Sequence, residues 1–122
     1  MTLLLPYPPS ANRYLRHTGH GTYRTGEANR YRSHARTVAL AAGVNLARTG
    51  PVEIAATLHP RLTKSGEASG VCLDLDNCLK VALDALQGVA FDNDRQVRRI
   101  TLVVGDPVTD GGLSLEVSRG PL

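Results

Sequence analysis

Residues 74–105 read DLDNCLKVALDALQGVAFDNDRQVRRITLVVG and carry the clearest structural signals in the chain. Leu79, Leu83 and Leu86 recur at helical spacing, which predicts a helix over about residues 75–87. Gly88 follows it as a helix stop. Residues 97–105 are rich in β-branched and aliphatic side chains and predict a strand. The stretch therefore predicts an amphipathic helix that leads into a sheet.

The rest of the chain adds further elements on both sides of this helix. Thr2–Leu5, Val52–His59 and Leu113–Ser118 have the composition of strands, while residues 10–25 predict an irregular loop or a hairpin. Apolar residues recur at threes and fours over Thr25–Ala47, which predicts a helix that stops at Thr49-Gly50-Pro51. The order β-α-β-α-β-β predicts an α+β fold with two helices and a small mixed or antiparallel sheet. We expect one domain over residues 1–122.

Length and composition narrow the class of protein. At 122 residues the chain is long enough for one core but not for two. No apolar run approaches the roughly 20 residues that span a bilayer, and the N-terminus lacks the pattern of a signal peptide. We therefore expect a cytoplasmic protein without a membrane partner. In that compartment Cys72 and Cys78 are expected to be small buried side chains and not a disulfide.

Charge is distributed unevenly along the chain. Residues 1–48 carry seven arginines against one acid, Glu27, for a net +6, whereas residues 49–122 carry a net −3. Twelve of the fourteen cationic side chains are arginine, whose planar fork matches the oxygens of a phosphate. A solvated basic face is the alternative interpretation, but such a face usually mixes both signs. The asymmetry favours a nucleic-acid partner.

Acidic side chains are concentrated in residues 74–105. Five of the seven aspartates lie within the 21 residues from Asp74 to Asp94. Carboxylates this close repel one another unless a cation or protons neutralise them. The four histidines lie apart from them, so zinc is a poor match, and hard oxygen ligands suit Mg²⁺ or Mn²⁺. The cluster predicts a divalent metal site.

Spacing gives several of these side chains two interpretations. In extended backbone, Asp74 and Asp76 point to one face and can share a cation, but Asp76 also stands where a helix N-cap is expected. Asp76, Lys80 and Asp84 lie four apart on one helical face. Either the three side chains form a ladder of surface ion pairs, or Lys80 places a positive charge beside a reacting phosphate. Asp84 is expected to take part in an ion pair with a structural role.

The position of Asp94 poses a geometric question. A helix of about twelve residues is roughly 18 Å long, so its far end is distant from Asp74 and Asp76. The segment from Val89 to Asp94 returns that distance only when it is nearly fully extended. Either this segment runs straight back along the helix, or Asp94 completes a site across a dimer interface.

Three segments together resemble the RusA family of Holliday junction resolvases. They are LPYPPSANRYLRH at 5–17, then DLDN at 74–77 with Lys80 and DAL at 84–86, and finally DRQV at 94–97. The resemblance implies a crossover junction endodeoxyribonuclease that binds four-way DNA junctions as a homodimer. It also implies paired symmetric nicks, with Mg²⁺ or Mn²⁺ as the cofactor, in DNA recombination and repair. No small-molecule cofactor is expected.

The resemblance assigns roles to individual residues. Asp74, Asp76 and Asp94 match the catalytic, metal-binding carboxylates, and Lys80 matches the essential lysine. Family members can carry a dense basic run before the first aspartate, where this chain has only Arg61, Lys64 and a Ser/Gly-rich loop. The residues expected to contact DNA are Asn12, Arg13, Tyr14, Arg16, His17, Arg61, Lys64 and Arg95.

Two other functions remain open at this point. One is a DNA-structure-binding protein without catalysis, in which the acids hold a stabilising ion. The other is a metal-dependent nuclease without preference for junctions. Magnesium-dependent nicking of a synthetic junction distinguishes a junction endonuclease from the non-catalytic DNA-binding protein. Competition by linear duplex distinguishes it from a nuclease without preference for junctions.

Overall fold

A computed structural model describes residues 2–67, 69 and 75–120. For residues 11 and 12 it describes the backbone but not the side chains. Its elements are β1 Thr2–Leu5, α1 Ala11–Tyr14, β2 Leu15–Thr18, β3 Gly21–Arg24, α2 Gly26–Ala42, β4 Val52–His59, α3 Leu75–Leu86, η1 Asp94–Gln96, β5 Val97–Val104 and β6 Gly112–Arg119. No helix in these described ranges is both long and apolar enough to cross a membrane.

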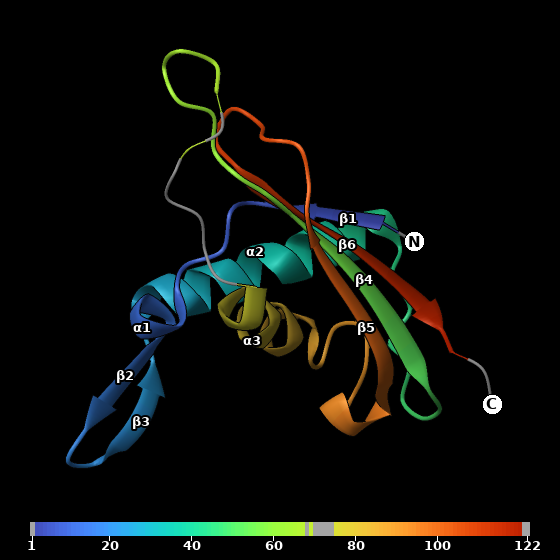
Figure 1. Cartoon of the computed structure of the whole chain (residues 1–122). Coiled ribbons are helices and arrows are strands. Elements are labelled where there is room, and N and C mark those ends of the chain that lie inside the picture. The colour runs from blue at the N-terminus through green and yellow to red at the C-terminus, as the bar shows by residue number, and fades with distance from the viewer. Residues whose placement is uncertain (1, 68, 70–74, 121–122) are drawn as a thin grey trace.

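A four-stranded mixed sheet forms the body of the molecule (Figure 1). Its strand order is β1-β6-β4-β5, with β4 and β5 parallel and the other neighbours antiparallel. Parallel neighbours need a crossover connection, and α3 supplies it between β4 and β5. The chain therefore leaves the end of β4, returns along α3 and re-enters the sheet at the start of β5.

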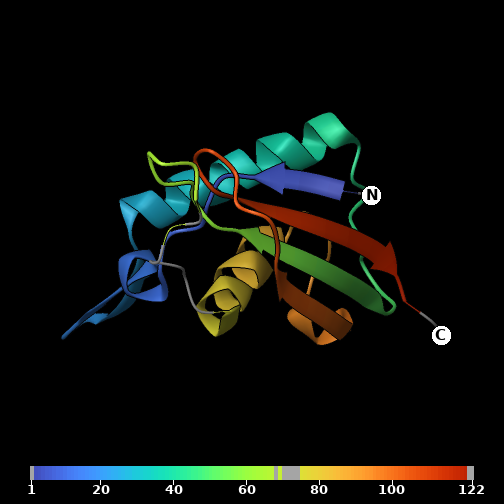
Figure 2. The same cartoon turned by 45° about the horizontal axis from the view of Figure 1, so that its top comes forward.

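Helices α2 and α3 pack together on one face of the sheet, as Figures 1 and 2 show. Alternate residues of the central strands face these helices and are buried: Val52, Ile54, Ala56 and Leu58 in β4, and Leu113 and Leu115 in β6. Helix α2 buries a row of small residues, Ala28, Ala35 and Ala39, beside Tyr31. Short side chains let the helix backbone approach its neighbours closely. The expected free thiol at position 78 is buried in this core, while Cys72 lies outside the described residues.

A separate two-stranded sheet, β2 and β3, projects from the body beside α1 (Figures 1 and 2). It realises the hairpin alternative predicted for residues 10–25, with one short helix, α1, before it. In both views the hairpin lies at the end of the molecule where α3 begins.

Most predicted elements are confirmed, and one boundary is wrong. The strands at 2–5 and 52–59 and the helix after residue 75 are present as expected, within a mixed sheet. The helix expected over residues 25–47 ends at Ala42. Gly43 adopts φ 76°, and its N–H bonds to the carbonyls of Ala39 and Leu40. A left-handed glycine closes a helix in this way, so Gly43 is the stop in place of Thr49-Gly50-Pro51.

Candidate active site

Helix α3 presents two of the predicted site residues at its N-terminal end. Asp76 lies in the first turn and is exposed. Lys80 is exposed one turn later and shares its face, because residues four apart are neighbours on a helix. The N-cap interpretation of Asp76 is wrong because the helix already includes Leu75, and the carboxylate instead complements the positive end of the helix dipole. Asp74 lies outside the described residues.

The third predicted carboxylate, Asp94, begins the short helix η1. Asn93 caps this helix, because its side-chain Oδ1 accepts from the Arg95 N–H at 2.9 Å. Asp94 is exposed, so its carboxylate is available to a ligand. The cap gives Asn93 a structural role beside the predicted metal ligand.

Gln96 ties this segment to a distant loop. Its Oε1 accepts from the N–H groups of Asp92 and Asn93, both at 3.0 Å. Its Nε2 donates to the carbonyls of Ala47 at 2.9 Å and Gly50 at 3.1 Å. The Gln96 amide thus uses both its oxygen and its nitrogen to hold η1 against the loop between α2 and β4.

Within one chain, the structure keeps Asp76 and Asp94 apart. Helix α3 has 12 residues, which corresponds to about 18 Å. Asp76 is at its start, whereas η1 lies beyond its end in both Figure 1 and Figure 2. Among the described residues, no three His, Cys, Asp or Glu side chains gather closely enough to hold a metal ion. The segment between α3 and η1 does not run straight back along the helix.

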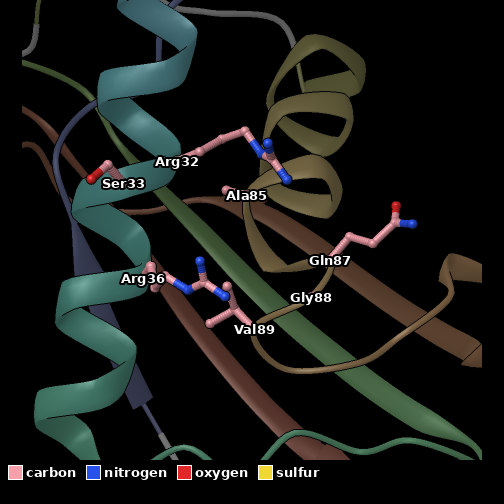
Figure 3. A pocket seen from close by; sticks show the side chains of 7 residues that line it. All are labelled: Arg32, Ser33, Arg36, Ala85, Gln87, Gly88 and Val89. Carbon is pink, nitrogen blue, oxygen red and sulfur yellow. The ribbon is translucent and has the colours of Figure 1, made fainter.

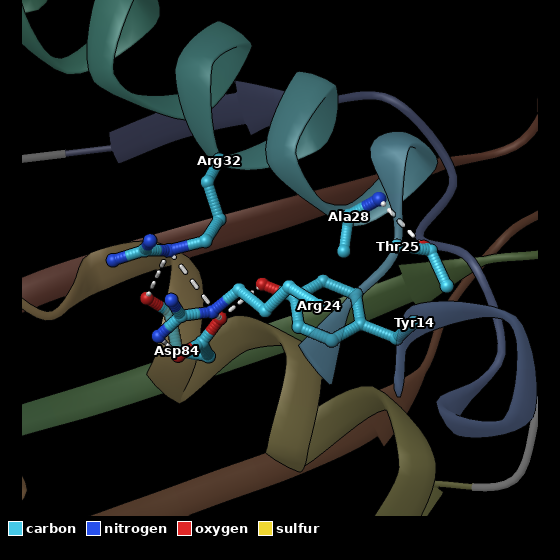
Figure 4. Close-up of polar contacts among 6 residues, drawn as sticks. All are labelled: Tyr14, Arg24, Thr25, Ala28, Arg32 and Asp84. Carbon is cyan, nitrogen blue, oxygen red and sulfur yellow. Dashed lines mark hydrogen bonds and ion pairs between the residues drawn. The ribbon is translucent and has the colours of Figure 1, made fainter. Parts of the chain in front are cut away.

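Asp84 forms a polar cluster with residues far away in the sequence (Figure 4). Arg24 binds it in bidentate fashion, through Nε to Oδ2 at 3.0 Å and through a terminal nitrogen to Oδ1 at 2.8 Å. The Tyr14 hydroxyl donates to Oδ2. Arg32 Nε lies 3.3 Å from Oδ2 and donates to the Asp84 carbonyl oxygen at 3.3 Å. The expected structural ion pair is confirmed, but its partners are arginines on β3 and α2, and no Lys80 pair occurs among the described residues.

Burial and charge shift the ionisation of this cluster. Burial raises the pKa of the Asp84 carboxyl, but hydrogen bonds from Arg24 and Tyr14 and the charges of Arg24 and Arg32 outweigh it, so the pKa lies below its ordinary value. Burial and the bond to Asp84 raise the pKa of the Tyr14 phenol. Asp84 is therefore a carboxylate, and Tyr14 a neutral donor, at neutral pH.

A basic groove of about 660 Å³ runs between the hairpin and the start of α2. Arg13, Arg16, His17 and Arg30 line it, together with Glu27. Glu27 pairs with Arg13 at 3.2 Å, which leaves most of the positive charge of the groove uncompensated. The predicted contacts Arg13, Arg16 and His17 are thus brought together on one surface.

Other residues expected to contact DNA lie elsewhere. Tyr14 is only 4% exposed and is bound to Asp84, so its side chain supports the hairpin from within the core. Arg61 stacks over the Tyr7 ring at 4.4 Å, and Lys64 is in an exposed turn nearby. Arg95 is on η1, away from the hairpin. The side chain of Asn12 lies outside the described part of the chain.

A second basic pocket of about 280 Å³ separates α2 from the end of α3 (Figure 3). Arg32 reaches across it towards α3 and Arg36 towards Val89, while the side chains of Ser33 and Gln87 point away. Cations near the carboxyl end of a helix complement its dipole. This pair of arginines therefore has a structural explanation in the packing of α2 on α3.

Comparison with known proteins identifies the family. A family model described as endodeoxyribonuclease RusA matches residues 6–117. This chain belongs to the RusA family. The protein named crossover junction endodeoxyribonuclease RusA in Escherichia coli O139:H28 is 34% identical over 112 residues, 91% of this chain and 87% of the relative. Its namesake in E. coli K12 is 33% identical over 111 residues (91% and 87%), and that of Enterobacteria phage 82 is 32% identical over 110 residues (90% and 86%).

The match to the RusA family spans the hairpin, α3 and η1, so it covers every element that carries a predicted site residue. Sequence reasoning missed two residues that position these elements. Arg24, which anchors the hairpin on Asp84, carries no local signal in the sequence. Gln96 could have been found from the Asn-x-x-Gln spacing of a capping box at 93–96.

Proposed function

We propose that this chain is a crossover junction endodeoxyribonuclease, a phosphodiester hydrolase that resolves Holliday junctions by paired symmetric nicks during recombination and repair. Membership of the RusA family carries the proposal. The surface agrees with it, because Asp76 and Lys80 are exposed on α3 and a basic groove lines the hairpin that is anchored on the same helix. We propose that the enzyme acts on DNA in the cytoplasm, without a small-molecule cofactor.

The carboxylates suit a hard divalent cation. Asp76 and Asp94 are exposed, and neither forms an ion pair with another described residue. Carboxylate oxygens are the ligands that Mg²⁺ prefers, and one or two protein carboxylates suffice for it. We propose that Asp74, Asp76 and Asp94 hold Mg²⁺, with Mn²⁺ as a substitute. Such an ion makes bound water more acidic and offsets charge on a reacting phosphate.

The remaining side chains have separate tasks in this proposal. Lys80 places a positive charge one turn from Asp76, where negative charge on the phosphate grows in the transition state. Arg13, Arg16 and His17 bind the DNA backbone in the groove beside the hairpin. Arg61, Lys64 and Arg95 contribute more distant backbone contacts.

A homodimer accounts for the separation of Asp76 from Asp94. β5 is an edge strand, and no backbone hydrogen bond to its outer side occurs among the described residues. Val103 and Val104 near its end are 46% and 52% exposed. An edge of this kind is open to pairing with a second chain. We propose that two β5 strands pair antiparallel about a twofold axis, which gives the symmetric dimer that a four-way junction requires.

Such pairing has a consequence for the active site. Antiparallel pairing sets the start of one β5 beside the end of the other. Helix α3 returns from the end of β4 to the start of β5, so α3 begins near the end of β5. Asp94, which lies just before β5, would then approach Asp76 of the partner subunit. Each active site would combine carboxylates from two chains.

Single substitutions test the metal site directly. Asp74→Asn, Asp76→Asn and Asp94→Asn should each abolish Mg²⁺-dependent cleavage of a synthetic four-way junction while junction binding persists. Wild-type binding without cleavage would instead favour a non-catalytic DNA-structure-binding protein. Undiminished cleavage by any one variant would refute the role assigned to that residue.

A further inference from the structure

The hairpin is an exposed arm that contributes nothing to the main core. All eight residues of β2 and β3 are exposed. The strands pair only with each other, from Leu15 opposite Arg24 to Thr18 opposite Gly21. An isolated two-stranded hairpin is marginally stable in water at best. The hairpin therefore needs stabilising contacts at its base, and its exposed surface is available to bind a ligand.

The anchor is the Asp84 cluster, which fixes the last residue of the arm to α3 (Figure 4). The Tyr14 carbonyl at the other end of the arm accepts from the Thr25 N–H at 2.9 Å. The Thr25 hydroxyl donates to the Arg13 carbonyl at 2.6 Å. Both strands are therefore held where they join the body, and the direction of the arm is fixed relative to the helix that carries Asp76.

Tyr23 indicates what the exposed surface of the hairpin can bind. Its side chain is 51% exposed, whereas Phe91, Tyr14 and Tyr31 are buried. Its hydroxyl donates to the His20 carbonyl at 3.1 Å, so the ring extends along the arm towards the turn. Arg16 is its exposed cross-strand partner on the same face. An aromatic face beside a guanidinium, both open to solvent, is the combination on which nucleobases stack.

We propose that the β2–β3 hairpin recognises the branch point of the junction: Tyr23 stacks on a nucleobase exposed there, and Arg16 binds the adjacent phosphate. This inference rests on the proposed function, because it requires DNA as the substrate. A four-way junction differs from linear duplex at the point where base stacking is interrupted. A ring carried on an anchored arm can use that difference, while the groove beside it binds the backbone common to both.

The test uses junctions with 2-aminopurine at the branch and Ca²⁺ in place of Mg²⁺ to prevent cutting. Wild type and Tyr23→Phe should change the fluorescence, and Tyr23→Ala should not. Since the stacking of one base on an aromatic ring strengthens binding, Tyr23→Ala should weaken junction binding about tenfold and leave duplex binding unchanged. Leu40→Ala, at an α2 residue that is 72% exposed, is the matched control and should behave as wild type.

Two contrary outcomes have different meanings. If wild type prefers the junction to duplex but Tyr23→Ala keeps the full preference and the fluorescence change, the arm has no role in branch recognition and the proposed function stands. If wild type shows no preference for the junction, the proposed function fails and the inference fails with it. Because Tyr23 is exposed, thermal unfolding of the alanine variant should match wild type and exclude misfolding as the cause.

Discussion

Asp84 shows what a single carboxylate contributes when its partners come from three other elements. Tyr14 precedes it by 70 residues and Arg24 by 60. Its helical neighbours Asp76 and Lys80 are visible in the sequence, so local spacing offered a ladder with Lys80 as one of two interpretations. Competition from two arginines and a phenol could not be read from that spacing. The sequence therefore predicted an ion pair for Asp84 but could not identify its partners.

The Asp84 cluster predicts a specific pH dependence. Because the pKa of Asp84 is lower in the folded chain than the ordinary value of 3.8, its stabilisation is present above that value and is lost as pH falls through the folded pKa. Asp84→Asn should lower the free energy of unfolding by about 1–3 kcal/mol at pH 7, because the substitution removes hydrogen bonds to a charged carboxylate. The difference from wild type should shrink in acid, below about pH 4.

Urea unfolding at neutral and acidic pH measures this effect. Asp110→Asn, in an exposed turn, serves as the control and should differ little from wild type at either pH. An Asp84→Asn penalty that stayed constant down to pH 3 would show that the charge of Asp84 is not what stabilises the cluster.

At the scale of elements, helix α2 ends where glycine permits a left-handed turn. Gly43→Ala should destabilise the protein by about 1 kcal/mol, because its φ of 76° is unfavourable for a residue with a Cβ even though the space around it is open. Gly19→Ala, which meets open space without a positive φ, should be close to neutral. Equal stability of the two variants in urea would contradict the capping role of Gly43.

The short helix η1 is held in place by Gln96, and this predicts a defect in cleavage without a defect in binding. Gln96→Ala removes the four hydrogen bonds that tie Asp92 and Asn93 to Ala47 and Gly50. A displaced Asp94 should slow junction cleavage tenfold to about a hundredfold. The matched control is Gln87→Ala, because the Gln87 side chain is exposed and points away from α2. Cleavage at the wild-type rate by Gln96→Ala would show that η1 needs no such support.

Element boundaries were predictable where local signals dominate. The β-branched and aliphatic composition of residues 52–59 and the apolar spacing after residue 75 each belong to one element, and both predictions are confirmed. Apolar residues continue past Gly43, so spacing alone extended α2 too far. Helix α1 has only four residues, too few to leave a periodic pattern.

For the whole molecule, the sequence predicted the class of fold and the question about Asp94 but not the order of strands in the sheet. β6 lies between β1 and β4, a pairing between the two ends of the chain that no local pattern encodes. The parallel pairing of β4 and β5 then leaves Asp76 and Asp94 at opposite ends of α3. The proposed twofold dimer follows from this arrangement.

A mixed dimer tests whether Asp94 acts across the interface. When one chain carries Asp76→Asn and the other Asp94→Asn, a shared site predicts one intact pair of carboxylates per dimer. Co-purified mixed dimers should then nick one strand of the junction, although each variant alone is inactive. Absence of nicking would place Asp76 and Asp94 of each site in the same chain. Dimers of wild type with Asp76→Asn provide the activity expected for a single site.

A metal-dependent nuclease with a preference for four-way junctions should cut a junction even when duplex DNA competes for it. Strand cleavage of a labelled mobile junction in Mg²⁺, with excess linear duplex of the same sequence as competitor, measures this preference. We predict symmetric nicks on two opposed strands that persist in the competitor and disappear with EDTA or Asp76→Asn. Cleavage that the duplex suppresses in proportion to its excess, or that survives EDTA, would contradict the proposed function.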